Sequence, residues 1–89
     1  MLRKGFIMKI ENDAYYNLPK LDKWVKEKIK LMYEAKEKYR KEKNDNNYFE
    51  LKQAIYDLIL ELKAVKSEGI LNDEEFFEMK DYYWDKLIN

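Results

Sequence analysis

The stretch Val65–Phe76, VKSEGILNDEEF, decides the fold, because it carries the signals that end one helix and begin another. Gly69 has no Cβ atom and can take the left-handed conformation that closes many helices. Ile70, the next residue, can then fold back toward Val65. The first half of the stretch therefore predicts that a helix ends just before Gly69.

The second half of the same stretch predicts the start of a new helix. Asn72 is a strong N-cap residue, and Glu75, three residues later, completes the pattern of a capping box. Leu71 and Phe76 occupy the positions at which a hydrophobic staple packs. Together the two halves predict a helical hairpin over residues 48–88.

The helix before this turn, predicted over residues 48–68, has the most regular apolar pattern in the chain. Its apolar residues recur at alternating spacings of three and four, the pattern of a heptad seam; they are Tyr48, Leu51, Ile55, Leu58, Leu62 and Val65. A second apolar line lies about 100° further round the helix and comprises Phe49, Tyr56 and Leu60. A helix with two apolar faces is central in its bundle or shared with a partner.

The helix after the turn, predicted over residues 73–88, is also broadly apolar. Its main stripe comprises Phe76, Met79, Tyr83 and Leu87, and Phe77, Trp84 and Ile88 widen that stripe to about half of the circumference. This width exceeds what one neighbouring helix can cover.

A further helix is predicted upstream, over residues 18–43. Asn17 is a candidate cap for it, and Pro19 is tolerated only in the first turn of a helix. Its apolar stripe comprises Leu21, Val25, Met32 and Tyr39, flanked by Trp24, Leu31, Ala35 and Ile29. The polar turn at residues 44–47 supplies the cap of the helix that follows.

Residues 1–16 are predicted to be irregular. Residues 6–10 suit a short extended segment, and Asp13 suits the cap of a small helix that carries Tyr15 and Tyr16. The predicted fold class is therefore all-α: one small domain, residues 1–89, with three main helices and an irregular N-terminal segment. Whether translation starts at Met1 or at Met8 stays open.

The residue types that catalysis needs are nearly absent. The chain has no His, Cys or Thr, and Ser67 is its only serine, so nucleophile and base pairs cannot be assembled. The carboxylates of the last predicted helix suit a favourable helix start and a solvated face better than a cation site; along one side they are Glu74, Glu78, Asp81 and Asp85. We therefore predict a non-enzymatic protein with no cofactor, no metal ion and no small-molecule substrate.

Composition also suggests a location and a source. The chain has no apolar run near the ~18 residues of a membrane span, and its start lacks the pattern of a signal peptide, so we expect a cytoplasmic protein with no membrane partner. Phe, Tyr, Met, Ile, Asn and Lys supply 46 of the 89 residues. This skew is typical of AT-rich codons, which predicts a low-GC bacterium or its phage, and it also explains part of the lysine content.

The net charge of zero hides an asymmetry between the two halves. Residues 1–43 hold 13 basic and 7 acidic side chains, whereas residues 44–89 hold 5 basic and 11 acidic ones. Three interpretations stay open: the halves attract each other within or between molecules, the basic helix binds nucleic acid through phosphates, or the acidic half binds a basic groove of another protein. The candidate polyanion contacts are Lys23, Lys26, Lys30, Lys38, Arg40 and Lys41.

Surplus aromatic residues favour a protein partner. Five aromatic side chains fall between residues 76 and 84, too many for one shallow core, and aromatic anchors are enriched in protein interfaces. The candidate interface residues are Tyr56, Leu60, Phe77, Tyr82, Trp84 and Ile88. We therefore predict a protein-interaction or oligomerisation module that self-associates. The alternative is a small phage or mobile-element regulator or inhibitor that binds nucleic acid through its Lys-rich helix or a basic protein groove through its acidic half.

The second hairpin resembles the SHOCT family, the short C-terminal domain of bacterial proteins, over about residues 59–84. The pattern shared with that family consists of spaced aliphatics, a glycine followed by two aliphatics, a capping residue, Glu-Glu-Phe and a later lysine; here these are Ile59, Leu62, Val65, Gly69, Ile70, Leu71, Asn72, Glu74, Glu75, Phe76 and Lys80. The chain departs from the family at Asn72, where threonine is usual, and at Tyr83 and Trp84, where leucines are usual. The resemblance implies an interaction or oligomerisation module without catalytic residues.

Overall fold

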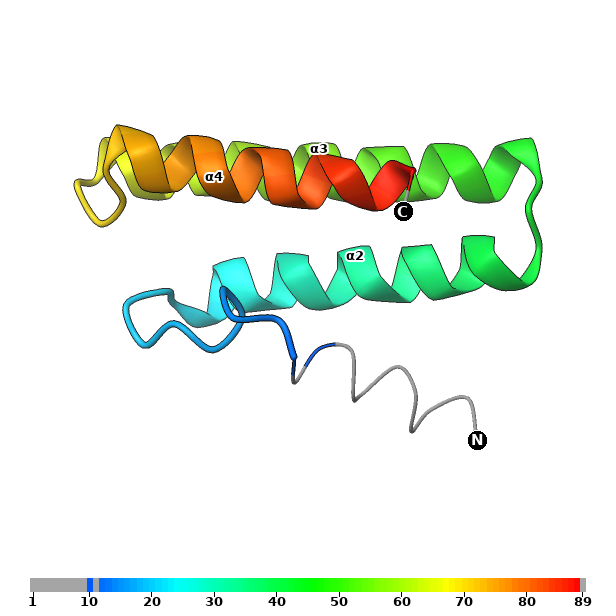
Figure 1. Ribbon diagram of the computed structural model, residues 1–89, viewed down its shortest axis with the longest axis horizontal. Coiled ribbons are helices and arrows are strands. Elements are labelled where there is room, and N and C mark those ends of the chain that lie inside the picture. The colour runs from blue at the N-terminus through cyan, green and yellow to red at the C-terminus, as the bar shows by residue number, and fades with distance from the viewer. Residues whose placement is uncertain (1–9, 11, 89) are drawn as a thin grey trace.

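The computed structural model describes residue 10 and residues 12–88, and this part of the chain is all-α, as predicted. The elements are α2 (Lys23–Lys41), α3 (Asp45–Ser67), α4 (Asp73–Trp84) and a short 3-10 helix, η1 (Asp85–Leu87). Successive helices run in opposite directions, with α3 in contact with both α2 and α4 (Figure 1). Of the extended segment predicted for residues 6–10, residues 6–9 lie outside the described residues, as does the alternative start at Met8. Ile10 is described, and it is helical rather than extended.

The turn between α3 and α4 is built as the sequence predicts. Gly69 has a φ of +83°, in the left-handed region. Its N–H donates to the Lys66 carbonyl at 2.9 Å, and the Ile70 N–H donates to the Val65 carbonyl at 3.2 Å. This pair of bonds is a Schellman motif, so the last carbonyls of α3 are satisfied within the turn.

The predicted capping box at the start of α4 is also confirmed. The Asn72 Oδ1 accepts from the Glu75 N–H at 2.7 Å, and the Glu75 Oε1 accepts from the Asn72 N–H at 3.0 Å. Leu71 and Phe76, the two staple residues, are both buried in the core. These contacts fix the angle at which the chain enters α4.

The first helix is shorter than predicted. Asp22, not Asn17, is the N-cap of α2, because its carboxylate accepts from the N–H groups of Trp24 and Val25. Pro19 lies before the helix, in a turn where the Leu21 N–H donates to the Leu18 carbonyl. A stronger cap and a proline upstream of it thus place the start of α2 at Lys23.

The connection between α2 and α3 depends on two asparagines. Asn44 caps α3 by accepting from the Asn47 N–H at 2.8 Å, which confirms that the 44–47 turn supplies this cap. The Asn47 side chain is itself buried and donates to the Glu42 carbonyl at 2.8 Å, at the end of α2. A side chain at the start of α3 therefore satisfies a backbone carbonyl at the end of α2. The α3 helix begins at Asp45, three residues earlier than predicted.

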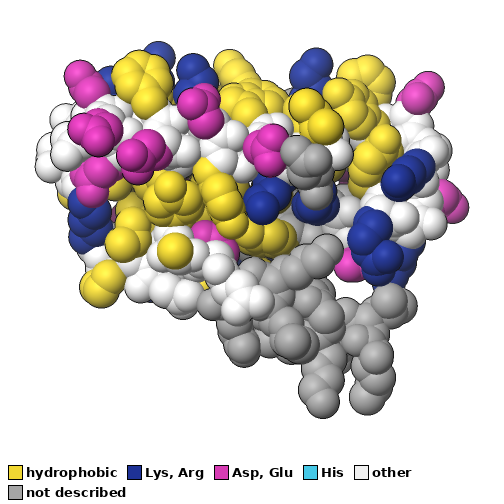
Figure 2. Space-filling model, viewed as in Figure 1, with side chains coloured by type: hydrophobic (Ala, Val, Ile, Leu, Met, Phe, Trp, Pro, Cys, Tyr) yellow, Lys and Arg dark blue, Asp and Glu magenta, His cyan; other side chains and the backbone are white. Residues whose placement is uncertain are grey.

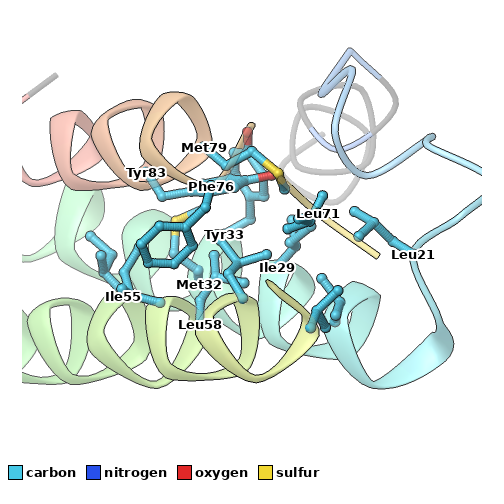
Figure 3. Close-up of a cluster of buried hydrophobic side chains, with 14 of the residues drawn as sticks. Leu21, Ile29, Met32, Tyr33, Ile55, Leu58, Leu71, Phe76, Met79 and Tyr83 are labelled. Atoms are coloured by element: carbon cyan, nitrogen blue, oxygen red, sulfur yellow. The ribbon is translucent and has the colours of Figure 1, made fainter. Parts of the chain in front are cut away.

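The core lies where the three helices meet (Figure 3). The predicted α3 seam forms its centre from Leu51 onward, since Leu51, Ile55, Leu58 and Leu62 are fully buried and Val65 nearly so. Tyr48, the first residue of the predicted seam, is exposed instead.

The predicted stripe of the first helix is largely confirmed, since Leu21, Val25 and Met32 are buried. The buried face also includes Ile29 and Tyr33, whereas Trp24 and Leu31, predicted beside the stripe, are exposed. Tyr33 belongs inside because its hydroxyl has a buried partner in the N-terminal segment.

Residues 12–22 lie across α2 and α4. The Tyr15 ring contacts the rings of Tyr82 and Tyr83, with centroids 5.1 and 6.0 Å apart, and Lys20 pairs with Glu75 of α4. Asp13 caps as predicted, accepting from the N–H groups of Tyr15 and Tyr16, but the segment it caps is a turn rather than a helix. This segment thus covers part of α4 that the sequence assigns to a partner.

No helix in the described part of the chain is both long and apolar enough to cross a membrane.

Gly69→Ala should lower the free energy of unfolding by about 1 kcal/mol, because an L-residue is strained at this φ although the space around the new Cβ is open. Gly69→Asn is the matched control and should cost less, since asparagine tolerates the left-handed region. Denaturant midpoints measure both changes. If Gly69→Val has the wild-type midpoint, the Schellman turn does not limit stability.

Candidate functional site

Large apolar side chains remain exposed along the outer side of the α3–α4 hairpin. Phe49, Tyr56 and Leu60 of α3 follow spacings of seven and four. Phe77 and Trp84 of α4 and Ile88, which caps η1, follow the same spacings; of the six residues only Trp84 is half-buried, because it packs against the core. We call these six residues the α3–α4 face. Phe49 is 63% exposed and Phe77 53% exposed. In Figure 2, apolar side chains gather along the edge that α3 and α4 form.

A shallow groove lies between α3 and α4 within the α3–α4 face. The groove is lined by Phe49, Lys52, Gln53 and Tyr56 of α3 and by Trp84 of α4. The end of α4 meets the start of α3 here because the two helices are antiparallel (Figure 1). The structure therefore brings Tyr56 and Trp84, two of the predicted interface residues, to one site.

Lysines lie among these rings. The Lys66 Nζ is 5.1 Å from the Phe76 ring centroid and 6.0 Å from that of Phe77, and the Lys80 Nζ is 5.8 Å from Phe77. Such cation–π contacts hold the ammonium groups beside the face while they remain hydrated. Lys52 lines the groove itself.

Carboxylates border the face on its α4 side. Glu74, Glu78 and Asp81 are exposed and follow spacings of four and three, which places them along one side of α4 next to Phe77. We call these three residues the acidic line. In the part of the chain that the structure describes, no group of three His, Cys, Asp or Glu residues is placed to hold a metal ion.

Tyr82 lies apart from the other predicted interface residues. It is half-buried on the opposite side of α4, where its ring contacts Tyr15 and the Lys86 Nζ lies 4.3 Å from its centroid. Ile88, by contrast, is 85% exposed at the end of the α4 line. The face thus contains five of the six predicted interface residues.

The candidate polyanion contacts of α2 do not form one free basic surface. Lys38 pairs with Glu50 at 3.0 Å, and Arg40 pairs with Glu37 at 2.6 Å, a contact that raises the pKa of Arg40. Lys23 and Lys26 lie over the rings of Trp24 and Tyr16. Lys30 and Lys41 are exposed.

Among residues 12–88, ion pairs join the basic half of the chain to the acidic half. They are Lys38–Glu50 and Lys20–Glu75, both at the surface. The hydrogen bond from Lys20, together with one from the Asn72 backbone, holds the pKa of Glu75 below its usual range. Exposed pairs of this kind contribute little to stability, so the charge asymmetry is only partly accounted for within one molecule.

The structure also contains a buried carboxylate that the sequence does not reveal as such. Asp13 is 1% exposed. Its carboxylate accepts from the Tyr33 hydroxyl at 2.7 Å and from the Tyr83 hydroxyl at 3.0 Å, in addition to the two backbone N–H groups of its own turn. Four donors therefore surround one buried acceptor group, which ties the N-terminal segment to both α2 and α4.

Burial is the main reason that the pKa values of Tyr83 and Tyr33 are raised far above their ordinary value, and the hydrogen bonds and negative charge of Asp13 add to it. Because the raised pKa belongs to the folded state, stability is fully present below the unfolded value of about 10 and falls as pH rises above it.

The melting temperature of the wild type should therefore fall above pH ~10 more steeply than that of Tyr83→Phe, which lacks one of these phenols. Tyr56→Phe is the matched control, because Tyr56 is half-exposed and should leave the slope unchanged. Thermal melts between about pH 8 and 11.5 measure this. If the melting temperature falls equally steeply with pH in all three proteins, the raised pKa of Tyr83 does not contribute to the loss of stability.

The chain matches no protein-family model, no curated protein and no solved structure. The SHOCT-like pattern of residues 59–84 therefore stays a prediction from sequence.

Proposed function

We propose that this protein is a non-enzymatic protein-interaction module and that the α3–α4 face is its binding surface. The observation that carries the proposal is that four large apolar side chains are exposed on two neighbouring helices; they are Phe49, Tyr56, Leu60 and Phe77. Two of them, Phe49 and Tyr56, line the groove between the helices. Contiguous apolar patches on small proteins mark interaction sites, and aromatic residues dominate the binding energy of such sites.

Two further features support this proposal over nucleic-acid binding. The acidic line borders the face and would repel phosphates, whereas Lys38 and Arg40 of α2 are already engaged by carboxylates. The resemblance of residues 59–84 to the SHOCT family implies the same class of function.

A capture experiment tests the proposal. Immobilised wild-type chain should retain proteins from a lysate of its own organism, and Tyr56→Ser/Phe77→Ser should lose them, because it removes two exposed rings without touching the core. Trp24→Ser is the matched control, since Trp24 is an equally exposed ring on α2. If the face variant retains the same proteins as the wild type, this surface is not the binding site.

A salt titration distinguishes binding through the apolar face from the alternative, nucleic-acid binding through the lysines of α2. Retention through an apolar face should persist as salt rises, whereas binding to DNA or RNA through lysines should weaken steeply.

A further inference from the structure

We propose that the partner of the α3–α4 face is the same face of a second copy of this chain, in a two-fold dimer that sets the acidic line of one copy against the lysines of the other. This inference rests on the proposed function, because it names the partner of the same surface. The observation behind it is that both acidic and basic side chains lie beside the apolar residues of the face.

The complementary groups are on different helices. The acidic line, Glu74, Glu78 and Asp81, follows α4, whereas Lys52 of α3 lines the groove between α3 and α4. Helical periodicity places Lys63 on almost the same side of α3 as Lys52, because the two residues are eleven apart. All five side chains are exposed, and none of these lysines makes an ion pair within the described part of the chain.

In a dimer with two-fold symmetry, the contact between the acidic line and the lysines occurs twice. In an isologous dimer each surface contacts its own copy, so α4 of one chain lies against the groove of the other and the reverse contact is identical. The acidic line then meets Lys52 and Lys63 in both contacts. Phe77 and Ile88 of one copy meet Tyr56 and Leu60 of the other. A partner of one charge sign would satisfy either the lysines or the carboxylates, but not both.

The size of the face predicts a weak dimer. Twelve residues of α4 span about 18 Å, and two neighbouring helices about 20 Å, so each partner offers on the order of 400 Å². This is about half of a standard interface, and such contacts are transient. The dissociation constant should therefore lie in the micromolar range.

The first test is sedimentation of the full chain between about 1 and about 300 µM, where the weight-average mass should rise from monomer toward dimer. Two charge-swap variants, Lys52→Glu/Lys63→Glu and Glu78→Lys/Asp81→Lys, should each weaken self-association at least about tenfold, because both place like charges opposite each other. All four sites are on the surface, so the variants should remain helical, which circular dichroism measures.

Mixing the two variants gives the decisive result. The mixed pair restores opposite charges in both contacts, so it should associate as the wild type does. Lys23→Glu/Lys30→Glu on α2 is the matched control and should leave self-association unchanged. A monomer at every concentration, or a dimer that the swaps do not affect or that mixing does not restore, would overturn this inference. If the chain stays monomeric while the face still captures another protein, the second-copy inference fails and the proposed function stands.

Discussion

Leu62→Ala should lower the free energy of unfolding by about 2 to 5 kcal/mol, which approaches the whole stability of a domain of this size. Leu62 is fully buried on α3, the helix that contacts both α2 and α4. Because both neighbouring helices are held by their own turns and caps, the cavity left by the side chain cannot close completely. Leu58→Ala, one step along the same seam, should cost a similar amount.

Denaturant unfolding at low micromolar concentration measures the effect, and Leu60→Ala is the matched control. Leu60 lies two residues before Leu62 on the same helix and is 47% exposed. The same truncation should therefore cost well under 2 kcal/mol there. If both variants unfold at the same midpoint, Leu62 is not in the core that the structure shows.

The features that the sequence predicts correctly are those specified by neighbouring residues. The turn after Ser67 needs only Gly69 and the few residues beside it, and the capping box needs only Asn72 and Glu75. The α3 seam is likewise a local repeat that no competing pattern interrupts. Local signals of this kind act before tertiary contacts form, so they can be recognised without knowledge of the fold.

The α2 helix was harder to predict because two signals compete there. Asn17 and Asp22 both suit an N-cap. In the structure residues 15–21 form turns, and the Asp22 carboxylate accepts the first N–H groups of α2. The periodicity of α2 predicts Trp24 beside its buried stripe and does not indicate Tyr33. Tyr33 is buried because its hydroxyl donates to Asp13, 20 residues away, which helical periodicity cannot show.

The predicted interface residues also differ in whether local periodicity or a long-range contact decides their exposure. Tyr56, Leu60 and Phe77 follow from helical periodicity alone, and the structure leaves them exposed as a surplus beyond the seam. Tyr82 follows the same reasoning but contacts Tyr15, 67 residues away, which no periodicity could indicate. The Asp13 cluster is the extreme case, since its tyrosines are 20 and 70 residues distant.

Asp13→Ala should lower the free energy of unfolding by roughly 3 kcal/mol, because it leaves the buried hydroxyls of Tyr33 and Tyr83 and two backbone N–H groups without their acceptor. The loss should also release the N-terminal segment from α4, which the near-ultraviolet dichroism of the Tyr15, Tyr82 and Tyr83 rings would report. Asp57→Ala is the control: its carboxylate accepts one exposed bond from Gln53, so its removal should change stability by about 0.5 kcal/mol or less.

A triple variant separates this cluster from simple packing. Asp13→Ala combined with Tyr33→Phe and Tyr83→Phe removes donors and acceptor together, so no buried hydroxyl is left unpaired, and part of the lost stability should return. If the loss of stability in Asp13→Ala came from a packing defect, it would instead grow or stay constant as the two hydroxyls are deleted. If the triple variant is less stable than Asp13→Ala alone, the carboxylate does not act through the two tyrosines. Recovery would show that one buried acceptor, shared between α2 and α4, holds the N-terminal segment in place.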